Sequence, residues 1–470
     1  MNKVLICDLD GTLIKTDMLF ESLFILLKNN FFYIFIIPFW LLKGKQVLKN
    51  EINNRIKFSP ENLPFNQDVI EFIKLNQARY SKIALVSASN QNIVKDIADH
   101  IGIFDEYYGS DDKLNLKAGN KRKFLDEKYG KGNYSYIGDS KADIEVWNHS
   151  NEKYIVNNSL SKSLKSIKFN SIIGNNKKSK IKLIIKEIRV YQWVKNLLIF
   201  IPALMAHITN FEIYLNLIYS FISFSLIASS VYVLNDLLDL EADRKHQRKK
   251  DRPFASGDLS LIYGFTLLPI LIISSLFIAI KFLPFEFLIV LLIYYTLTSL
   301  YSFKLKRIVI LDIITLALLY TIRIIAGGEA VSVEVTPWAL AFSMFLFLSL
   351  ALLKRYTELH SLKEIDELKA SGRGYHVDDI EIVRSFGTSS ALISILVFAL
   401  YVNSEQIRLL YNKPNLMWIV AILLLFWIMR IWFLANRGKM TDDPIVFTGK
   451  DKLSWAIGGI ISLIVIFAKI

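Results

Sequence analysis

Asn235-Asp236-Leu237-Leu238-Asp239-Leu240-Glu241-Ala242-Asp243 follows an apolar run that begins near residue 213 and is long enough to cross a membrane. On a helix, offsets of three and seven residues place Asp236, Asp239 and Asp243 on one face. Closely spaced carboxylates repel one another unless a cation lies between them, and Mg²⁺ bound to a diphosphate is a suitable cation. The motif therefore predicts a diphosphate site at the end of a membrane helix.

Basic residues after this motif complement phosphate charge, and they are Arg248, Lys249, Lys250 and Arg252. An ordinary solvated loop is the alternative interpretation, but such loops seldom place acids at helical spacing beside an apolar span. The residues expected at this site are Asn235, Asp236, Asp239 and Asp243 for Mg²⁺, with Arg252 for phosphate.

Long apolar runs fill the chain beyond residue 192. The 470 residues are 53% hydrophobic, with a mean hydropathy of +0.36, which excludes a purely soluble globular protein. We expect an all-α bundle of about nine transmembrane helices, beginning near residues 192, 213, 260, 284, 308, 336, 382, 415 and 453. The net charge of +13 fits negatively charged membrane lipids and phosphorylated substrates better than nucleic acid.

Lysine and arginine are concentrated in the loops after the second, fourth, sixth and eighth expected spans. Because basic loops stay on the cytoplasmic side, we expect a multi-pass protein of the cell (inner) membrane with its diphosphate site on the cytoplasmic side. The N-terminal residues do not read as a signal peptide. A Ser-, Asn- and Lys-rich linker over residues 157–186 would lie along the membrane and keep the N-terminal domain on the same side.

Residues 1–156 alternate short β-branched runs with helical stretches, as an α/β domain does. The expected strands are Lys3–Leu9, Lys82–Ser87, Tyr134–Ile137 and Lys153–Val156. Cys7, the single cysteine, excludes an internal disulfide and is expected in the core. The apolar run Leu19–Leu42 is broken by Lys28-Asn29-Asn30 into two pieces too short to cross a bilayer. It predicts a helical pair that caps the domain and lies at the membrane surface.

The first strand ends in Asp8-Leu9-Asp10-Gly11-Thr12. Residues two apart on a strand project the same way, so Asp8 and Asp10 can converge on one site at its carboxyl end. One carboxylate can attack phosphorus while the other handles the proton of the leaving group. Gly138-Asp139-Ser140-Lys141-Ala142-Asp143 follows another strand and supplies carboxylates for Mg²⁺.

Ser87 and Lys121 lie between these two motifs and could hold phosphate oxygens, with Lys117 and Lys123 as neighbours of Lys121. The whole set resembles the haloacid dehalogenase superfamily over about the first 155 residues. This resemblance implies a Rossmannoid phosphatase domain in which Asp8 is the nucleophile, Asp10 the general acid/base, Ser87 and Lys121 bind phosphate, Asp8, Asp10 and Asp139 hold Mg²⁺, and Asp143 gives support. The alternative is an ordinary turn with two solvated aspartates, which the second motif disfavours.

The aspartate motif and the number of spans resemble the UbiA prenyltransferase superfamily, whose members ionise an allylic diphosphate. The usual second aspartate-rich loop is replaced here by Lys354-Arg355-Tyr356-Thr357-Glu358. Further segments resemble the decaprenyl-phosphate phosphoribosyltransferase branch across about residues 187–455. They are Arg189–Asn196, Tyr301–Lys306, Asp312 and Arg323 in the fifth span, Gly372–Tyr375 and Asp443–Phe447.

This second resemblance implies Mg²⁺-dependent transfer of a 5-phosphoribosyl group from phosphoribosyl diphosphate to a polyprenyl phosphate. The further phosphate-binding residues would be Lys195, Lys304, Lys306, Arg323, Lys354 and Arg355, supported by Glu358. Asp312, Arg323 and Glu358 could instead form structural ion pairs between helices. The attached phosphatase could then dephosphorylate the phosphoribosyl lipid.

Two other functions remain open. Prenyl transfer to an aromatic acceptor would need a second acidic pair, and the sequence offers only Glu358, Glu364 and Asp366 near that position. A transporter or lipid-binding protein with a degenerate head is disfavoured by intact motifs in both halves. The expected domains are a phosphatase domain at 1–156, the basic linker at 157–186 and a membrane transferase at 187–470.

Overall fold

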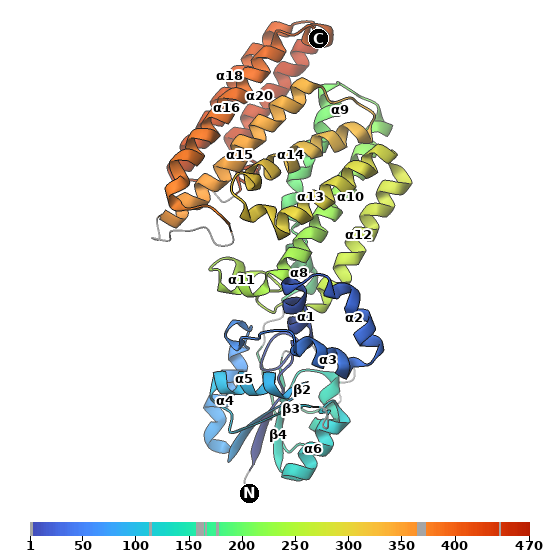
Figure 1. The fold of residues 1–470 in the computed structure, drawn as a ribbon, viewed down its shortest axis with the longest axis vertical. Coiled ribbons are helices and arrows are strands. Elements are labelled where there is room, and N and C mark those ends of the chain that lie inside the picture. Colours follow the sequence, from blue (N-terminus) through green and yellow to red (C-terminus); the bar gives the residue numbers. More distant parts are fainter. Residues whose placement is uncertain are drawn as a thin grey trace. The chain divides into compact units, whose positions relative to one another are not determined.

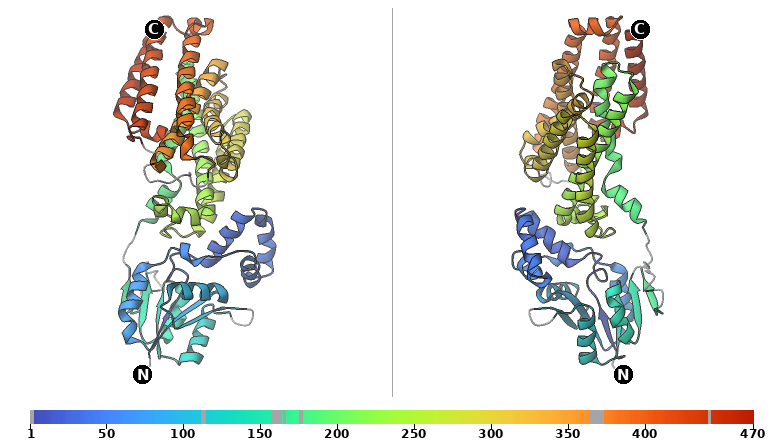
Figure 2. Two further views of the ribbon diagram at one scale, coloured as in Figure 1. Left: turned by 60° about the vertical axis from the view of Figure 1, so that its left-hand side comes forward. Right: turned by 90° about the vertical axis from the view of Figure 1, so that its right-hand side faces the viewer.

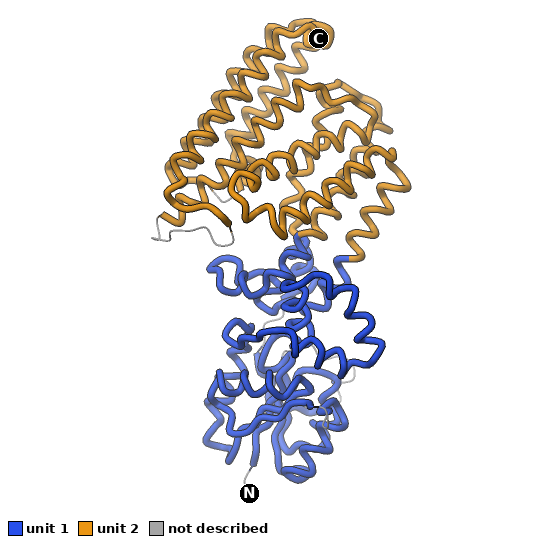
Figure 3. The backbone as a smooth tube through the Cα atoms, in the orientation of Figure 1, with its two compact units in different colours: residues 1–188, 232–268 blue, residues 189–231, 269–470 orange. Residues whose placement is uncertain are grey.

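The structure is a computed structural model that describes residues 3–111, 115–156, 164, 167–174, 178–363, 373–440 and 443–470. The chain divides into two compact units, drawn in different colours in Figure 3. The first unit comprises residues 1–188 and 232–268, and the second comprises residues 189–231 and 269–470. The aspartate motif therefore belongs to the same compact unit as the N-terminal α/β region.

Six parallel strands form the sheet of the first unit, in the order β3-β2-β1-β4-β5-β6. Figure 1 labels β2, β3 and β4 of this sheet. They are β1 (Val4–Cys7), β2 (Lys82–Asn90), β3 (Glu106–Ser110), β4 (Tyr134–Gly138), β5 (Lys153–Val156) and β6 (Ser171–Ile173). The four expected strands are confirmed as β1, β2, β4 and β5. The sequence analysis missed β3 and β6, and β6 lies inside the segment that we expected to be a linker.

Helices of the first unit cover the sheet, form its cap, or lie in the later segments of this unit. They are α1 (Met18–Asn29), α2 (Tyr33–Leu42), α3 (Lys45–Asn53), α4 (Gln67–Asn76), α5 (Gln91–Ile101), α6 (Gly119–Tyr129), α7 (Ile144–His149), α8 (Lys180–Glu187) and α11 (Leu240–Lys245). The expected helical pair of the cap is confirmed as α1 and α2, and α3 extends it. α1 begins where the Asp17 side chain accepts a hydrogen bond from the Leu19 N–H.

The side chains of β1 are buried alternately on the two faces of the sheet, because successive residues of a strand point in opposite directions. Leu5 and Cys7 pack with apolar residues of α4 and α5. Val4 and Ile6 pack with residues of α6 and α7 on the other face. Cys7 is a buried core residue, as expected. This two-sided packing fixes the carboxyl ends of β1, β2 and β4 beside one another at one edge.

Within the described residues, eight helices are long and apolar enough to cross a membrane. Their helical segments are α10 (Phe211–Leu238), α12 (Ile262–Phe282), α13 (Phe285–Phe303), α14 (Leu311–Ala330), α15 (Pro337–Lys363), α16 (Ile380–Val402), α18 (Met417–Asn436) and α20 (Lys452–Lys469). The shorter helices of this region are η4 (Val190–Phe200), α9 (Ile201–Met205), α17 (Glu405–Leu410) and α19 (Pro444–Thr448).

The expectation of nine spans is wrong at the first one. The apolar segment predicted to begin near residue 192 forms η4 and then α9, and it falls short of the length of the other eight. Arg189 and His207, which flank this segment, both have positive φ angles. Such backbone turns end a helix, so the apolar run cannot continue as one long span.

Helices α15, α16, α18 and α20 pack against one another in chain order, and Figure 2 shows them side by side in orange and red. Gly387 of α16 makes one of these contacts possible. A Cβ atom at that position would lie 2.3 Å from the indole of Trp432 on α18. Small residues of this kind let membrane helices approach closely.

A buried ion pair joins the cap to the segment after the aspartate motif within the first unit. Arg244 Nη2 lies 2.6 Å from Glu21 Oε1, and the two side chains are 8% and 3% exposed. Arg244 also donates to the backbone oxygens of Asn62 and Ala255. Since both charges are removed from water, neither can lose its partner without a large cost in stability.

We expect the Glu21→Ala substitution to lower the free energy of unfolding of the first unit by about 3–5 kcal/mol, because Arg244 would stay buried without its carboxylate. Pulse proteolysis of the detergent-solubilised full chain in urea measures this change. Glu51→Ala is the matched control in the same cap, because both side chains of its pair with Arg55 are more than one-third exposed and the pair contributes at most about 1 kcal/mol. Equal free energies of unfolding for the two variants would contradict a stabilising role of the Glu21–Arg244 pair.

Candidate functional site

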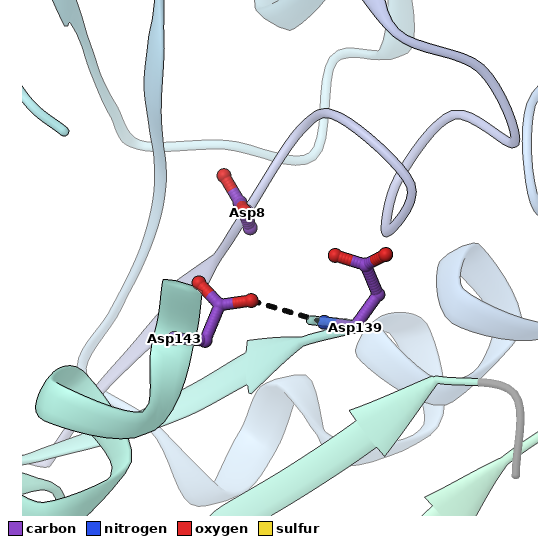
Figure 4. Close-up of side chains that lie close together, drawn as sticks. All are labelled: Asp8, Asp139 and Asp143. Carbon is purple, nitrogen blue, oxygen red and sulfur yellow. Dashed lines mark hydrogen bonds between the residues drawn. The ribbon is translucent and has the colours of Figure 1, made fainter. Parts of the chain in front are cut away.

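Three acidic side chains meet at the carboxyl edge of the sheet, where β1 and β4 are paired (Figure 4). Asp8 follows β1, Asp139 follows β4, and Asp143 ends a short helical turn that Ser140 caps. One oxygen atom of each carboxylate lies within 4.8 Å of the other two. The fold thus brings together the two acidic motifs that lie far apart in the sequence.

Lys121 of α6 compensates part of this negative charge. Its Nζ lies 2.8 Å from Asp8 Oδ1 and 4.0 Å from Asp143 Oδ1. The neighbouring Lys117 and Lys123 are both exposed, so Lys121 is the lysine of this segment that reaches the cluster. The Tyr136 hydroxyl accepts from Lys121 at 3.0 Å and donates to Asp143 at 2.7 Å. The sequence analysis missed Tyr136, whose role depends on its place in β4.

Asp10 lies beside the serines of β2. Its Oδ2 accepts from the Ser89 hydroxyl at 2.9 Å and from the Ser87 hydroxyl at 3.3 Å. Its Oδ1 accepts from the Met18 N–H at the start of α1. The predicted neighbours Asp10 and Ser87 are therefore brought together. Ser89 was missed, although its spacing of two residues from Ser87 could have indicated a shared strand face.

Burial and crowding make the carboxylates of this cluster weaker acids. Desolvation, followed by the charges of Asp143 and Asp8, raises the pKa of Asp139 to about 8. Desolvation also raises the pKa of Asp8, against the influence of Lys121. Between about pH 4 and pH 8, Asp139 therefore keeps in the folded protein a proton that it has lost in the unfolded chain. Its contribution to the free energy of unfolding falls as the pH rises through this range. A bound cation would offset this loss, and carboxylate oxygens are the donors that Mg²⁺ prefers.

The aspartate motif lies on two helices instead of one. Asn235 and Asp236 are in the last turn of α10, whereas Asp243 is in α11 and Asp239 lies between the two helices. The expectation of one continuous helical face is therefore wrong at Asp239, where φ −101° and ψ 16° interrupt the helix. Arg252 nevertheless brings two of the acids together, since its Nη1 lies 2.8 Å from Asp236 and 2.5 Å from Asp243.

The Arg252 guanidinium bridges two nearly buried carboxylates, which are each about 3% exposed. Burial raises the pKa of Asp243, and Arg252 opposes this rise. In the aspartate motif, Asp236 and Asp243 thus converge on the guanidinium of Arg252. The same three side chains present both the negative groups that hold a divalent metal and a positive group that binds phosphate.

Two predicted phosphate-binding lysines converge in the second unit. Asp443 accepts from Lys195 at 2.5 Å and from Lys354 at 3.5 Å. It also caps α19 by accepting from the N–H groups of Ile445 and Val446. Although burial opposes the effect, Lys195 and Lys354 hold the pKa of Asp443 well below its usual range. The sequence analysis named Asp443 only as part of a motif and did not assign it to the site.

The predicted phosphate-binding arginines of the second unit contact protein groups. Arg355 pairs with Asp312 and Glu358, and its side chain is 1% exposed. Arg323 donates to Asn196 at 2.8 Å and to the Tyr294 hydroxyl at 3.0 Å. Asp312 and Glu358 thus form ion pairs, as the structural alternative expects, and Arg355 is their partner. The Arg323 hydrogen bonds to Asn196 and Tyr294 go to uncharged groups.

The remaining predicted residues have separate positions. Glu358 also pairs with Arg373 at 2.8 Å. Lys304 is exposed and Lys306 is half-buried in the turn between α13 and α14. Glu364, Asp366 and Gly372 lie outside the described residues.

Comparisons with known proteins match both the membrane region and the chain as a whole. Residues 196–450 match the UbiA prenyltransferase family. A protein of Sinorhizobium fredii, called uncharacterized protein y4nM, is 35% identical over 475 residues, which cover 97% of this chain and 89% of that protein. The decaprenyl-phosphate phosphoribosyltransferase of Mycobacterium tuberculosis is 35% identical over 182 residues, or 38% of this chain and 60% of that protein.

A solved structure of a UbiA homolog from Archaeoglobus fulgidus, bound to GPP and Mg²⁺, is 14% identical with a TM-score of 0.47. It covers 61% of this chain, and this chain covers 99% of it. The family match spans more than half of the chain, and eight helices of membrane-crossing length are present among the described residues. This multi-pass membrane protein therefore belongs to the UbiA prenyltransferase family.

Proposed function

We propose that the protein is a bifunctional membrane enzyme. Its UbiA part transfers a 5-phosphoribosyl group from phosphoribosyl diphosphate to a polyprenyl phosphate, with release of diphosphate. Its N-terminal part is a phosphatase of the haloacid dehalogenase type that removes the 5-phosphate from the resulting lipid. The observation that carries the first activity is the Asp236–Arg252–Asp243 group, and the Asp8–Asp139–Asp143 cluster carries the second.

The relatives and the basic residues support phosphoribosyl transfer over prenyl transfer. The Mycobacterium tuberculosis relative is called a decaprenyl-phosphate phosphoribosyltransferase. A phosphoribosyl donor carries a 5-phosphate in addition to its diphosphate, so it needs more cations than an allylic diphosphate does. Lys195 and Lys354 both contact Asp443. Lys354 lies in the segment that replaces the usual second aspartate-rich loop. The basic loops favour a cytoplasmic location for both activities.

In the transferase, Asp236 and Asp243 would hold Mg²⁺, with Asn235 and Asp239 beside them. Magnesium would supply positive charge to the departing diphosphate. Arg252 must release at least one of the two carboxylates that it now bridges. Its planar guanidinium can then donate two parallel hydrogen bonds to phosphate oxygens. The same arginine thus compensates the acids before the substrate binds and the diphosphate afterwards.

In the phosphatase, the Asp8 carboxylate would attack phosphorus and form an aspartyl phosphate as the bond to the leaving oxygen breaks. Asp10 would give a proton to that oxygen and then take one from the water that hydrolyses the intermediate. Lys121 opposes the rise in the pKa of Asp8 and thereby favours its nucleophilic, ionised form. Ser87 lies close enough to Asp10 to orient the phosphate next to the acid.

Magnesium should raise the melting temperature of the first unit more at pH 8 than at pH 5, because protonated carboxylates bind metal poorly. Differential scanning fluorimetry of the detergent-solubilised chain with and without Mg²⁺ measures the difference. Asp139→Asn should lose part of the rise in melting temperature that Mg²⁺ causes. Asp96→Asn should show the full rise, because Asp96 is an exposed residue of α5. An increment that is the same in all three proteins would exclude a metal at this cluster.

Asp236→Asn should reduce phosphoribosyl transfer by about 10²–10³-fold or more, the loss typical of removing catalytic electrostatics. The assay follows label from phosphoribosyl diphosphate into the lipid fraction with polyprenyl phosphate and Mg²⁺. Asp258→Asn is the control, since Asp258 pairs with the exposed Lys178 in the same unit. Near-normal transfer by Asp236→Asn at saturating Mg²⁺ would refute the assignment. Prenylation of an aromatic acid in place of this reaction would support the other enzyme activity.

Asp8→Asn should leave transfer intact and accumulate a phosphorylated ribosyl lipid, whereas the native protein yields the dephosphorylated form. The reason is that the substitution removes the nucleophile and changes no residue of the membrane helices. Mass spectrometry of the extracted lipid distinguishes the two products. If both proteins gave the same lipid, the phosphatase would act on another substrate or on none.

A further inference from the structure

Helix α2 is apolar along its whole length and buries none of its residues. Its sequence is Tyr-Ile-Phe-Ile-Ile-Pro-Phe-Trp-Leu-Leu. Phe35 is 68% exposed, Phe39 is 65% exposed and Leu42 is 84% exposed, as is the preceding Phe32 at 74%. A helix in water usually turns an apolar stripe toward a core and a polar face outward. α2 has no polar face, and its exposed surface requires a covering partner.

The neighbouring helix α1 shows that the cap does not need α2 for its own core. α1 buries Met18, Leu23 and Phe24 among other residues, and Met18 belongs to the main core of the sheet. α2 instead packs along one side on α3 and α1 and leaves its other side chains outside. An ordinary cap, in which the two apolar segments simply cover each other, therefore does not account for α2.

Positive charges border this apolar helix on both sides. Lys28 lies near the end of α1, and Lys43 and Lys45 follow α2, all of them exposed. The guanidinium of Arg55 lies 5.0 Å from the ring of Trp40. The sequence has no aspartate or glutamate between Glu21 and Glu51. An apolar helix with aromatic residues and a basic border is typical of helices that lie in the surface of a negatively charged membrane.

We propose that α2 inserts its apolar side chains into the surface of the bilayer that the membrane helices of the same chain already occupy. The basic border fits anionic lipid headgroups, which attract lysine and arginine side chains at the membrane surface. A second copy of α2 is a poorer partner, because a symmetric contact between equal surfaces would bring equal positive charges together. The bilayer matches both the apolar helix and its charges.

This contact also specifies the substrate of the phosphatase, an inference that rests on the proposed phosphatase activity. Asp10 accepts a hydrogen bond from Met18, the first residue of α1, and α1 leads directly into α2. The helices that border the candidate site are thus continuous with the membrane-contacting helix. We infer that the site takes a phosphate monoester carried by a membrane lipid in preference to a water-soluble one.

Fluorescence quenching in the full chain tests the membrane contact. A fluorescent label is attached to the cysteine of the Phe35→Cys variant, and the protein is placed in nanodiscs of phosphatidylglycerol and phosphatidylethanolamine. The native Cys7 does not compete for the label because its thiol is buried. Leu75→Cys on α4 is the matched control, because Leu75 is also apolar and 84% exposed. We expect nitroxide-bearing lipids to quench the label at position 35 at least threefold more than the label at position 75. Equal quenching at the two positions overturns the proposal, and so does shielding of position 35 by a second copy without lipid quenching.

A double variant, Phe35→Ser with Phe39→Ser, tests the substrate inference. It should lower dephosphorylation of the phosphoribosyl lipid at least tenfold and leave hydrolysis of p-nitrophenyl phosphate within twofold of native. Unchanged activity on both substrates overturns the substrate inference, whatever the quenching shows. If the native protein hydrolyses neither substrate, the substrate inference fails together with the phosphatase activity, and the quenching result still decides the membrane contact.

Discussion

Ionised carboxylates cannot be buried close together unless a cation compensates their repulsion, and both acidic groups of the first unit contain such a cation. Lys121 lies between Asp8 and Asp143, and Arg252 lies between Asp236 and Asp243. In each group the cation is near enough to stabilise the acids before any ligand binds. In the proposed reactions, the same cation would be available to a phosphate oxygen once a metal joined the acids. One electrostatic requirement thus accounts for the composition of both candidate sites.

Much of the α/β region could be predicted because its acidic motifs follow directly on buried strands. Parallel strands end at the same edge of a sheet, so the motifs at Asp8 and Asp139 had to approach each other once β1 and β4 were paired. Tyr136 and Ser89 could not be assigned in the same way, because their roles arise only from the packing of neighbouring strands. β3 was missed because it is polar and half-buried, and β6 because it has only three residues.

In the membrane region, hydrophobicity predicted where helices are found but not how the backbone ends them. The turns at Arg189 and His207 limit the first apolar run, and the break at Asp239 divides the aspartate motif. Side-chain roles were harder still to predict. Arg355 stands in a basic stretch that suits phosphate, yet its partner Asp312 comes from another helix. Local sequence gives the charge of such a residue, whereas only the helix packing determines which group neutralises it.

The Glu21–Arg244 pair has a consequence for how such a two-part gene can evolve. Arg244 directly follows the last acid of the aspartate motif, while Glu21 is in the cap of the N-terminal region. Splitting the gene after residue 188 would separate the two partners, so each product would expose to water a charge that the native fold buries. Fission would therefore also have to replace the contacts that residues 232–268 make within the first unit. The ion pair thus favours keeping the two coding regions joined, because residues from both regions complete one folded unit.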